Sequence, residues 1–301
     1  MRFKRGVKFI LPLFFFVLLS SGALAYKISK KWVGYPSVYG SFINYKNSDI
    51  KENGYALTGY LSLWYGYFDN LQLGAAYTYI KYKNASDLKQ KDFTVVYSNT
   101  NRWIRNHIVT LGFHYIDTTD ELTDGGKVFL VDVTRYFLDS KYHYYFKWNF
   151  GIGGYFSSYD KKEHFNVYQV SPHSTVKLFA SPFKGAVYLD LIGYYIHLTK
   201  AKEVGLSEKN YYSFEADIRY YKDRGYIKLG GWVGKQVFAV KNTGFVVYNL
   251  TEKYKGGIVF GVGHTFPQGL SVGLSLGISS FEEAGKNSVQ EVLTGSVSYH
   301  F

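Results

Sequence analysis

The side chains that could perform acid–base or nucleophilic chemistry are spread along the whole chain. The sequence has eight histidines and no cysteine, which excludes thiol nucleophiles, disulfides and thiolate metal sites. No HExxH motif occurs, and His173 and Ser174 would point to opposite faces of an extended segment. Hydrolytic catalysis needs a nucleophile and a base within hydrogen-bond reach. We therefore expect no catalytic residue, no metal site and no cofactor, and we do not expect an enzyme.

Charged side chains within regular extended segments are more informative than the histidines. In segments that alternate apolar and polar residues, a set of charges falls on the polar face: Asp132, Lys147, Lys177, Asp190, Glu215, Asp217, Arg219 and Lys228. Tyr188, Tyr194 and Trp232 share this face and would either narrow or fill an enclosed space. If the face lines a lumen, its charges either select solutes or pair with one another and hold neighbouring strands together. Both interpretations fit the sequence.

The elements that must position these side chains are β-strands. Apolar and polar residues alternate with period two from Tyr35 onward, most clearly from Leu270 to Ser279, and the helical period is missing. The pattern predicts fourteen strands, over residues 35–45, 55–67, 71–82, 91–99, 106–116, 127–137, 142–157, 166–180, 186–198, 211–221, 226–240, 253–266, 270–281 and 288–301. The turn from Thr100 to Arg105 is the least distinct, so twelve strands are the fallback. Pro172 is expected to mark a bulge.

The composition and the connections indicate a transmembrane barrel. Hydrophobic residues make up 47% of the chain and aromatic residues 20%, and a soluble sandwich or propeller would expose much of this surface. In lipid every backbone polar group must be paired internally, and among sheets only a closed barrel achieves this. Tight turns alternate with longer loops, as in bacterial barrels. The sequence therefore predicts an all-β fold, a transmembrane antiparallel β-barrel with both termini in the periplasm. It forms one domain over residues 26–301, with a periplasmic lead-in over residues 26–34.

The first 25 residues have the anatomy of a cleaved signal peptide. An apolar run from Phe9 to Leu19 follows four cations, Arg2, Lys4, Arg5 and Lys8. The run is shorter than the about twenty residues that a membrane-spanning helix needs. Ala23 and Ala25 form a small-residue cleavage site, so the mature chain is expected to begin at Tyr26.

The end of the chain supplies a resemblance to a known class. The alternating residues Leu293, Gly295, Val297, Tyr299 and the terminal Phe301 fall on one face. This pattern resembles the C-terminal strand signature of bacterial outer-membrane β-barrel proteins, a porin-like class. The resemblance implies insertion by the barrel-assembly machinery and residence in the outer membrane, in contact with its lipid and lipopolysaccharide. It identifies no particular subfamily.

Positive charge is concentrated on the side of the tight turns. Removing the four signal-peptide cations lowers the formal net charge from +12 to +8. The basic residues of this periplasmic rim, partly offset by Asp69, are Lys27, Lys30, Lys31, Arg102, Arg105, Lys184, Lys222 and Arg224. The simpler explanation is solubility in the periplasm. The alternative hypothesis is that the rim attracts anionic solutes or an acidic periplasmic partner.

Three functions fit these observations. Barrels of eight strands are filled by side chains, whereas sixteen to eighteen leave an aqueous channel, and fourteen lies between. Because no predicted connection is long enough to form a plug, we expect a narrow passive channel for ions or small polar solutes. The alternatives are a structural or assembly barrel that docks a periplasmic partner, and a lipid-modifying outer-membrane enzyme. Nothing in the sequence suggests nucleic-acid binding.

Overall fold

The structure is a computed structural model that describes residues 32–66, 68–138, 146–181 and 183–301. The predicted signal peptide, its cleavage site and residues 26–31 of the lead-in lie outside the described residues. The first strand begins at Trp32, so the last three residues of the predicted lead-in already belong to the barrel.

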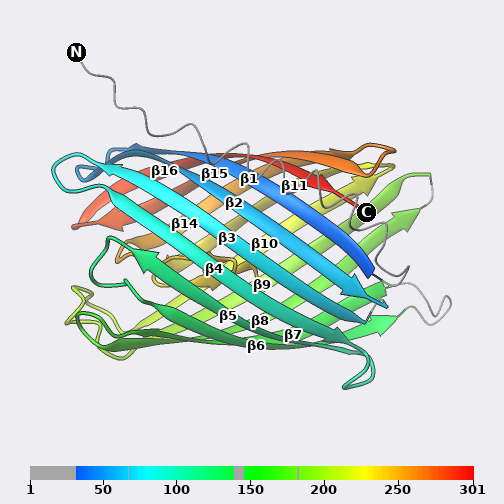
Figure 1. Cartoon of the computed structure of the whole chain (residues 1–301), viewed down its shortest axis with the longest axis horizontal. Helices are drawn as coiled ribbons and strands as arrows, with labels where there is room; N and C mark the ends of the chain where they lie inside the picture. The colour runs from blue at the N-terminus through cyan, green and yellow to red at the C-terminus, as the bar shows by residue number, and fades with distance from the viewer. Residues whose placement is uncertain (1–31, 67, 139–145, 182) are drawn as a thin grey trace, which may run out of the picture.

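Long strands form one closed antiparallel barrel (Figure 1). Its fourteen strands are β1 (Trp32–Lys46), β2 (Lys51–Tyr65), β3 (Asp69–Tyr82), β4 (Leu88–Thr100), β5 (His107–Thr118), β6 (Lys127–Leu138), β7 (Phe146–Tyr159), β8 (Phe165–Ser181), β9 (Gly185–Leu198), β10 (Asn210–Lys222), β11 (Gly225–Gln236), β14 (Lys253–Thr265), β15 (Leu270–Glu283) and β16 (Lys286–Tyr299). Consecutive barrel strands pair, and β16 closes the cylinder against β1. The predicted fold and the count of fourteen strands are confirmed, and the fallback of twelve is not needed.

The period-two pattern explains which face of each strand lies outside. Leu274 and Leu276 of β15 are 52% and 45% exposed, while Ser275 and Gly277 between them point to the other side of the sheet. Such an apolar outer face would be unfavourable in water, but it matches the hydrocarbon layer of a membrane. The inner face carries the polar residues and the buried clusters described below.

The two ends of the barrel differ in their connections. The chain terminus Phe301 lies at the same end as the tight turns, and its N–H donates to the carbonyl oxygen of Gly34 at 3.2 Å. Bacterial barrels with an even number of strands keep both termini and the short turns in the periplasm, so we call this end the periplasmic end. The two longest connections, residues 199–209 between β9 and β10 and residues 237–252 between β11 and β14, lie at the opposite end, which we call the external end. This end also carries the two-residue turn 284–285 between β15 and β16, so the predicted alternation of tight turns and longer loops holds only in part.

Two local predictions differ from the structure. Pro172 lies in regular register opposite Ile152, and the register shift of β8 falls later, between Lys177 and Phe179. A proline that faces outward needs no bulge, because the missing N–H removes only a ladder bond on one side. Residues 142–145 of the predicted strand 142–157 lie outside the described residues, and β7 begins at Phe146.

The prediction that no connection is long enough to form a plug is wrong, because one connection crosses the lumen. β11 ends at Gln236 instead of residue 240, which leaves residues 237–252 between β11 and β14. This lumen segment contains β12 (Val240–Lys241), the 3-10 turn η1 (Asn242–Gly244) and β13 (Val246–Val247). Positive φ angles at Gly234 and Phe238 turn the backbone away from the strand direction. The apolar run 237–240 continues the alternation of the strand in sequence, but these turns direct it into the barrel.

Candidate functional site in the barrel lumen

The lumen segment crosses the barrel from one wall to the other. It leaves the wall at β11, and η1 contacts β4, β5 and β6 on the far side. The ring of Phe245 packs edge-on against Tyr60 of β2, with ring centroids 5.2 Å apart. The same ring lies over Gly74 of β3, where any Cβ atom would come within 2.8 Å of it. Strands on opposite walls can share one partner only through the interior of the cylinder.

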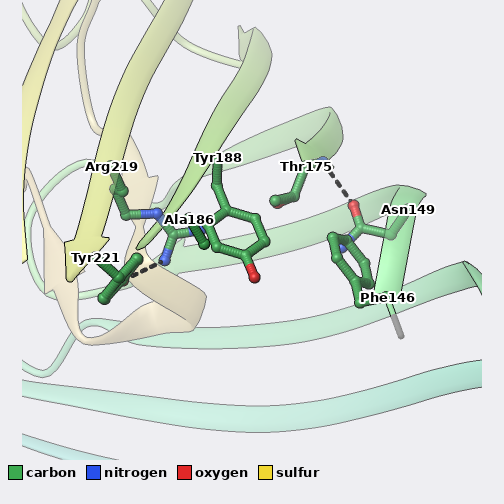
Figure 2. A pocket seen from close by; sticks show the side chains of 7 residues that line it. All are labelled: Phe146, Asn149, Thr175, Ala186, Tyr188, Arg219 and Tyr221. Atoms are coloured by element: carbon green, nitrogen blue, oxygen red, sulfur yellow. Dashed lines mark hydrogen bonds between the residues drawn. The ribbon is translucent and has the colours of Figure 1, made fainter. Parts of the chain in front are cut away.

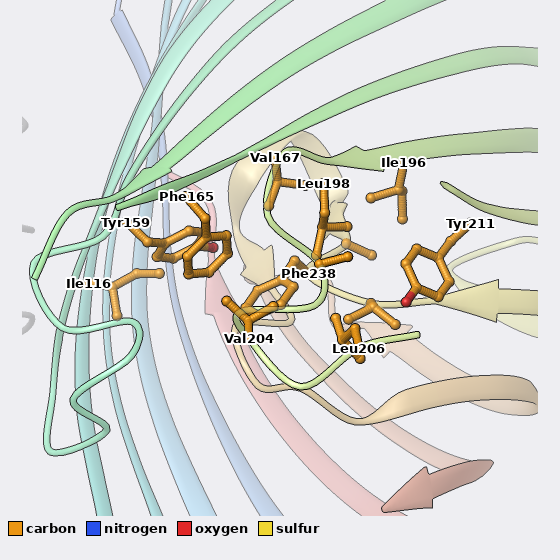
Figure 3. Close-up of a cluster of buried hydrophobic side chains, with 13 residues drawn as sticks. Ile116, Tyr159, Phe165, Val167, Ile196, Leu198, Val204, Leu206, Tyr211 and Phe238 are labelled. Atoms are coloured by element: carbon orange, nitrogen blue, oxygen red, sulfur yellow. The ribbon is translucent and has the colours of Figure 1, made fainter. Parts of the chain in front are cut away.

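Apolar side chains fix the segment on the side of β5 and β7–β10. Phe238 is fully buried against the stacked rings of Tyr159 and Phe165, at centroid distances of 5.5 and 5.1 Å (Figure 3). Val204 and Leu206 of the connection 199–209 join the same buried cluster. Burial of several large side chains at about 1.5–3 kcal/mol each is enough to hold a segment of this length in place. The cluster therefore fills this part of the barrel interior near its external end.

Polar contacts secure the middle of the segment. The side chain of Gln169 on β8 accepts the N–H of Val240 at 2.8 Å and donates to its carbonyl oxygen at 2.7 Å. Lys241 reaches Glu215 of β10 at 2.5 Å, and its ammonium lies over the rings of Tyr194 and Trp232 at 5.5 and 5.6 Å. A buried cation is stable only when it is paired in this way.

Glu252, the last residue of the lumen segment, forms an ion pair with a buried lysine. The side chain of Lys51, at the start of β2, is 1% exposed and pairs with Glu252 and with Glu283 of β15. Its ammonium lies 3.0 Å from Glu283. Tyr248 stacks on Tyr254 nearby, and burial raises the pKa of the Tyr248 hydroxyl. Glu252, Lys51 and Glu283 thus join the segment to two walls of the barrel.

Five of the residues predicted to line the lumen meet on neighbouring strands. Arg219 donates from Nε and Nη2 to the two carboxylate oxygens of Asp190, at 2.5 and 2.7 Å. Lys228 pairs with Asp217 at 2.6 Å. The carboxylate of Asp217 lies over Gly230, where a Cβ atom would come within 1.6 Å of its oxygen. Any side chain at position 230 would therefore clash with this carboxylate. Glu215 is the fifth, and it pairs with Lys241 of the lumen segment.

The remaining three predicted residues are placed separately. Asp132 is buried on β6 and accepts a 2.8 Å hydrogen bond from His173 of β8. Lys177 lies directly opposite Tyr188 and on the same face. A register shift between β6 and β7 falls next to Lys147, so alternation does not fix the direction of its side chain.

Register arranges the charges of β8–β11 in two rows. Lys177, Tyr188, Arg219 and Lys228 follow one another as direct partners on adjacent strands. The next row lies two residues further along each strand, away from the periplasmic end. It consists of Thr175, Asp190, Asp217 and Gly230. The inner wall therefore carries a row of cations nearer the periplasm and a row of acids behind it.

Sequence reasoning missed the histidine partners, because these come from other strands. His114 of β5 is buried, with Nδ1 2.8 Å from the Thr94 hydroxyl and Nε2 3.3 Å from Asp92. His173 lies 3.4 Å from the Thr134 hydroxyl and also contacts Asp132. Thr94 is almost fully buried and lines no described cavity, so this group is best explained as a polar contact between strands.

A cavity of roughly 480 Å³ opens near the periplasmic end (Figure 2). We call it the aromatic pocket; its lining residues are Phe146, Asn149, Thr175, Ala186, Tyr188, Arg219 and Tyr221. Phe146 and Tyr188 have ring centroids 6.3 Å apart, and Tyr188 and Tyr221 5.9 Å apart. The pocket thus places three aromatic rings next to the charged rows.

Comparison with known proteins identifies the fold but no family. No protein-family model matches the chain, and no curated protein matches its sequence. A Pseudomonas aeruginosa FadL homologue has a TM-score of 0.52 at 9% identity, over 90% of each chain. The CymD monoaromatic hydrocarbon channel gives 0.52 at 10% identity, over 94% of this chain and 91% of its own. A bacterial polysaccharide outer membrane secretin gives 0.52 at 10% identity, over 89% and 98%.

The chain has the fold of bacterial outer-membrane β-barrels. Among the described residues, no helix has the length and apolar character to cross a membrane. The residues that the structure describes also contain no group of three or more His, Asp or Glu side chains placed to hold a metal ion.

The terminal strand and the rim take defined places in this barrel. Leu293, Val297 and Tyr299 are exposed on the outer face of β16, and the Phe301 ring lies against Gly34 of β1 at the closing seam. On the rim, Arg102 pairs with Asp69 at 2.8 Å. Lys27, Lys30 and Lys31 lie outside the described residues. Recognition of the terminal strand and attraction by the rim remain predictions.

Proposed function

We propose that the chain is a passive outer-membrane channel for small polar solutes, narrowed by the lumen segment. The proposal rests on a closed barrel whose inner wall bears rows of charged side chains. The lumen segment crosses the space that this wall encloses. Charged inner walls set the selectivity of barrel channels. The overall likeness to CymD, which is named as a channel, supports the same broad class.

Recording in planar bilayers tests the proposal, and the fold offers a clean variant. Gln236 and Tyr254 are direct partners, so a short glycine–serine turn can replace residues 238–251 between β11 and β14. The variant also carries Glu215→Gln, because the deletion removes Lys241, the ion-pair partner of Glu215. We expect a small conductance from the native chain and a conductance several times larger from the shortened variant. Replacing the exposed external turn 160–164 by the same linker is the control and should leave the conductance unchanged. If neither the native chain nor the shortened variant conducts above lipid background, the channel proposal is refuted.

A second candidate is a structural barrel that docks a periplasmic partner. Phe183, in a periplasmic turn beside Lys184, is 88% exposed, and Trp103 and Ile104 are exposed beside Arg102 in another turn. Exposed aromatic residues and arginine are enriched at protein interfaces. A photo-crosslinker at position 183 in intact cells should give one dominant protein adduct if this candidate is right. Adducts with lipid alone would reject it.

A further inference from the structure

We propose that the aromatic pocket binds a small aromatic carboxylate, of which benzoate is the simplest example. This inference rests on the proposed function, because it names the class of solute that the channel would accept. The pocket combines ring faces with a surplus of hydrogen-bond donors, and each of these features restricts the ligand.

The rings define the apolar part of the ligand. Phe146, Tyr188 and Tyr221 surround the cavity, and Figure 2 shows Tyr188 standing between Arg219 and Asn149. Aromatic rings prefer offset-stacked or edge-to-face contacts at centroid distances of about 4.5–7 Å. The cavity volume of roughly 480 Å³ accommodates one small ring among them.

The polar groups define the charged part. Arg219 uses three N–H groups, two toward Asp190 and one toward the Tyr221 hydroxyl at 3.3 Å. A guanidinium has five, so two remain. Asn149 uses its carbonyl oxygen to accept the N–H of Thr175, which leaves its amide N–H groups. Tyr188 has no hydrogen-bond partner among the described residues and adds a hydroxyl.

The carboxylate beside the site already has its hydrogen-bond partners. The carboxylate of Asp190 accepts the Thr175 hydroxyl at 2.7 Å in addition to both bonds from Arg219. What remains for a ligand is therefore mainly donors, and their complement is a group that only accepts, such as a carboxylate. Arg219 lies in the row of cations between Tyr188 and Lys228, which strengthens the attraction for an anion. A neutral sugar would need as many acceptors as donors.

Equilibrium dialysis of the full chain in detergent micelles tests the inference independently of conductance. The probes are benzoate, benzyl alcohol, which keeps the ring without charge, and cyclohexanecarboxylate, which keeps the charge without an aromatic ring. We expect benzoate to bind at least about tenfold more tightly than benzyl alcohol, because a hydrogen bond to a charged group is worth this factor. Over cyclohexanecarboxylate, which keeps the charge, we expect a preference of about threefold from the contacts between aromatic rings. Equal binding of benzoate and benzyl alcohol, or no binding of benzoate, would overturn the proposal.

Variants separate a binding role from a structural one. Asp190→Asn removes the competing anion and should tighten benzoate binding about threefold or more, whereas a purely structural ion pair predicts loss. Asp190→Asn with Arg219→Gln removes the pair without leaving a buried charge, and should weaken benzoate binding at least about tenfold. Tyr188→Leu should weaken benzoate more than cyclohexanecarboxylate.

Two controls match these variants. Tyr195→Leu changes a tyrosine on the outer face of the same strand, and Arg102→Gln breaks an arginine–aspartate pair outside the pocket. Both should leave benzoate binding unchanged, and a loss in either would count against the pocket. Benzoate binding without conductance would refute the channel alone, and conductance without benzoate binding would refute this inference alone.

Discussion

Replacing Lys51 by methionine should free one end of the lumen segment at a large cost in stability. The native ammonium is 3.0 Å from Glu283 and also pairs with Glu252, and all three side chains are almost fully buried. At an effective dielectric constant of about 20, two unit charges at this distance attract by about 5 kcal/mol. Part of this attraction offsets the cost of burying the charges, so removing one partner of such a group typically costs about 3–5 kcal/mol.

Thermal unfolding in detergent, followed by circular dichroism in the β-sheet region, measures this cost. At about 2–4 °C per kcal/mol for a chain of this size, Lys51→Met should lower the midpoint by roughly 10 °C. Adding Glu252→Gln and Glu283→Gln removes the unpaired buried charges and should restore most of the loss. Single-channel records of Lys51→Met should also show more frequent conductance steps. A midpoint within 2 °C of the native value would refute the role assigned to this group.

Three further changes test other contacts. Gly74→Leu should displace Phe245 from the far wall and raise the conductance, as measured in planar bilayers; unchanged conductance would mean that this contact does not limit the lumen. Lys161 donates to Asp124 and holds the pKa of this carboxyl below its ordinary value. The stability that this contact supplies is therefore complete above about pH 4, and it is lost as the pH falls through the lowered pKa of Asp124. The amide of Thr118, which donates to Asp124 at 3.0 Å, should then exchange faster at pH 3 than at pH 6 after correction for intrinsic rates. The double variant Asp217→Arg with Arg219→Asp exchanges the two charges. It should keep the barrel folded but shift the reversal potential in a salt gradient. An unchanged potential would mean that these charges only hold neighbouring strands together.

The wall of the barrel could be predicted from sequence because it depends on local alternation. Leu270 to Ser279 alternates large and small residues without interruption, and β15 covers this range. The separation of outward and inward faces follows from the same alternation. It fails only where the register shifts, as beside Lys147.

The lumen segment could not be predicted because its contacts depend on closure. Phe245 meets Gly74 and Tyr60 only because β2 and β3 lie across the cylinder from β11. Val237 to Val240 are apolar, and in a linear sequence they extend the preceding strand. The turn at Phe238 requires a positive φ in a residue that rarely adopts one, and its cost is offset by burial of the ring.

The arrangement of the inner charges argues for a role beyond holding strands together. Asp217 lies directly opposite Asp190, and Arg219 directly opposite Lys228, so the direct partners are like charges. Like charges in direct opposition destabilise a sheet, and the observed ion pairs are therefore diagonal. Exchanging Asp217 and Arg219 would put opposite charges face to face with the same composition. Selection for stability alone would favour the exchanged order. The separate rows of cations and acids instead maintain an electric field along the lumen, and a solute passing through the barrel would experience this field.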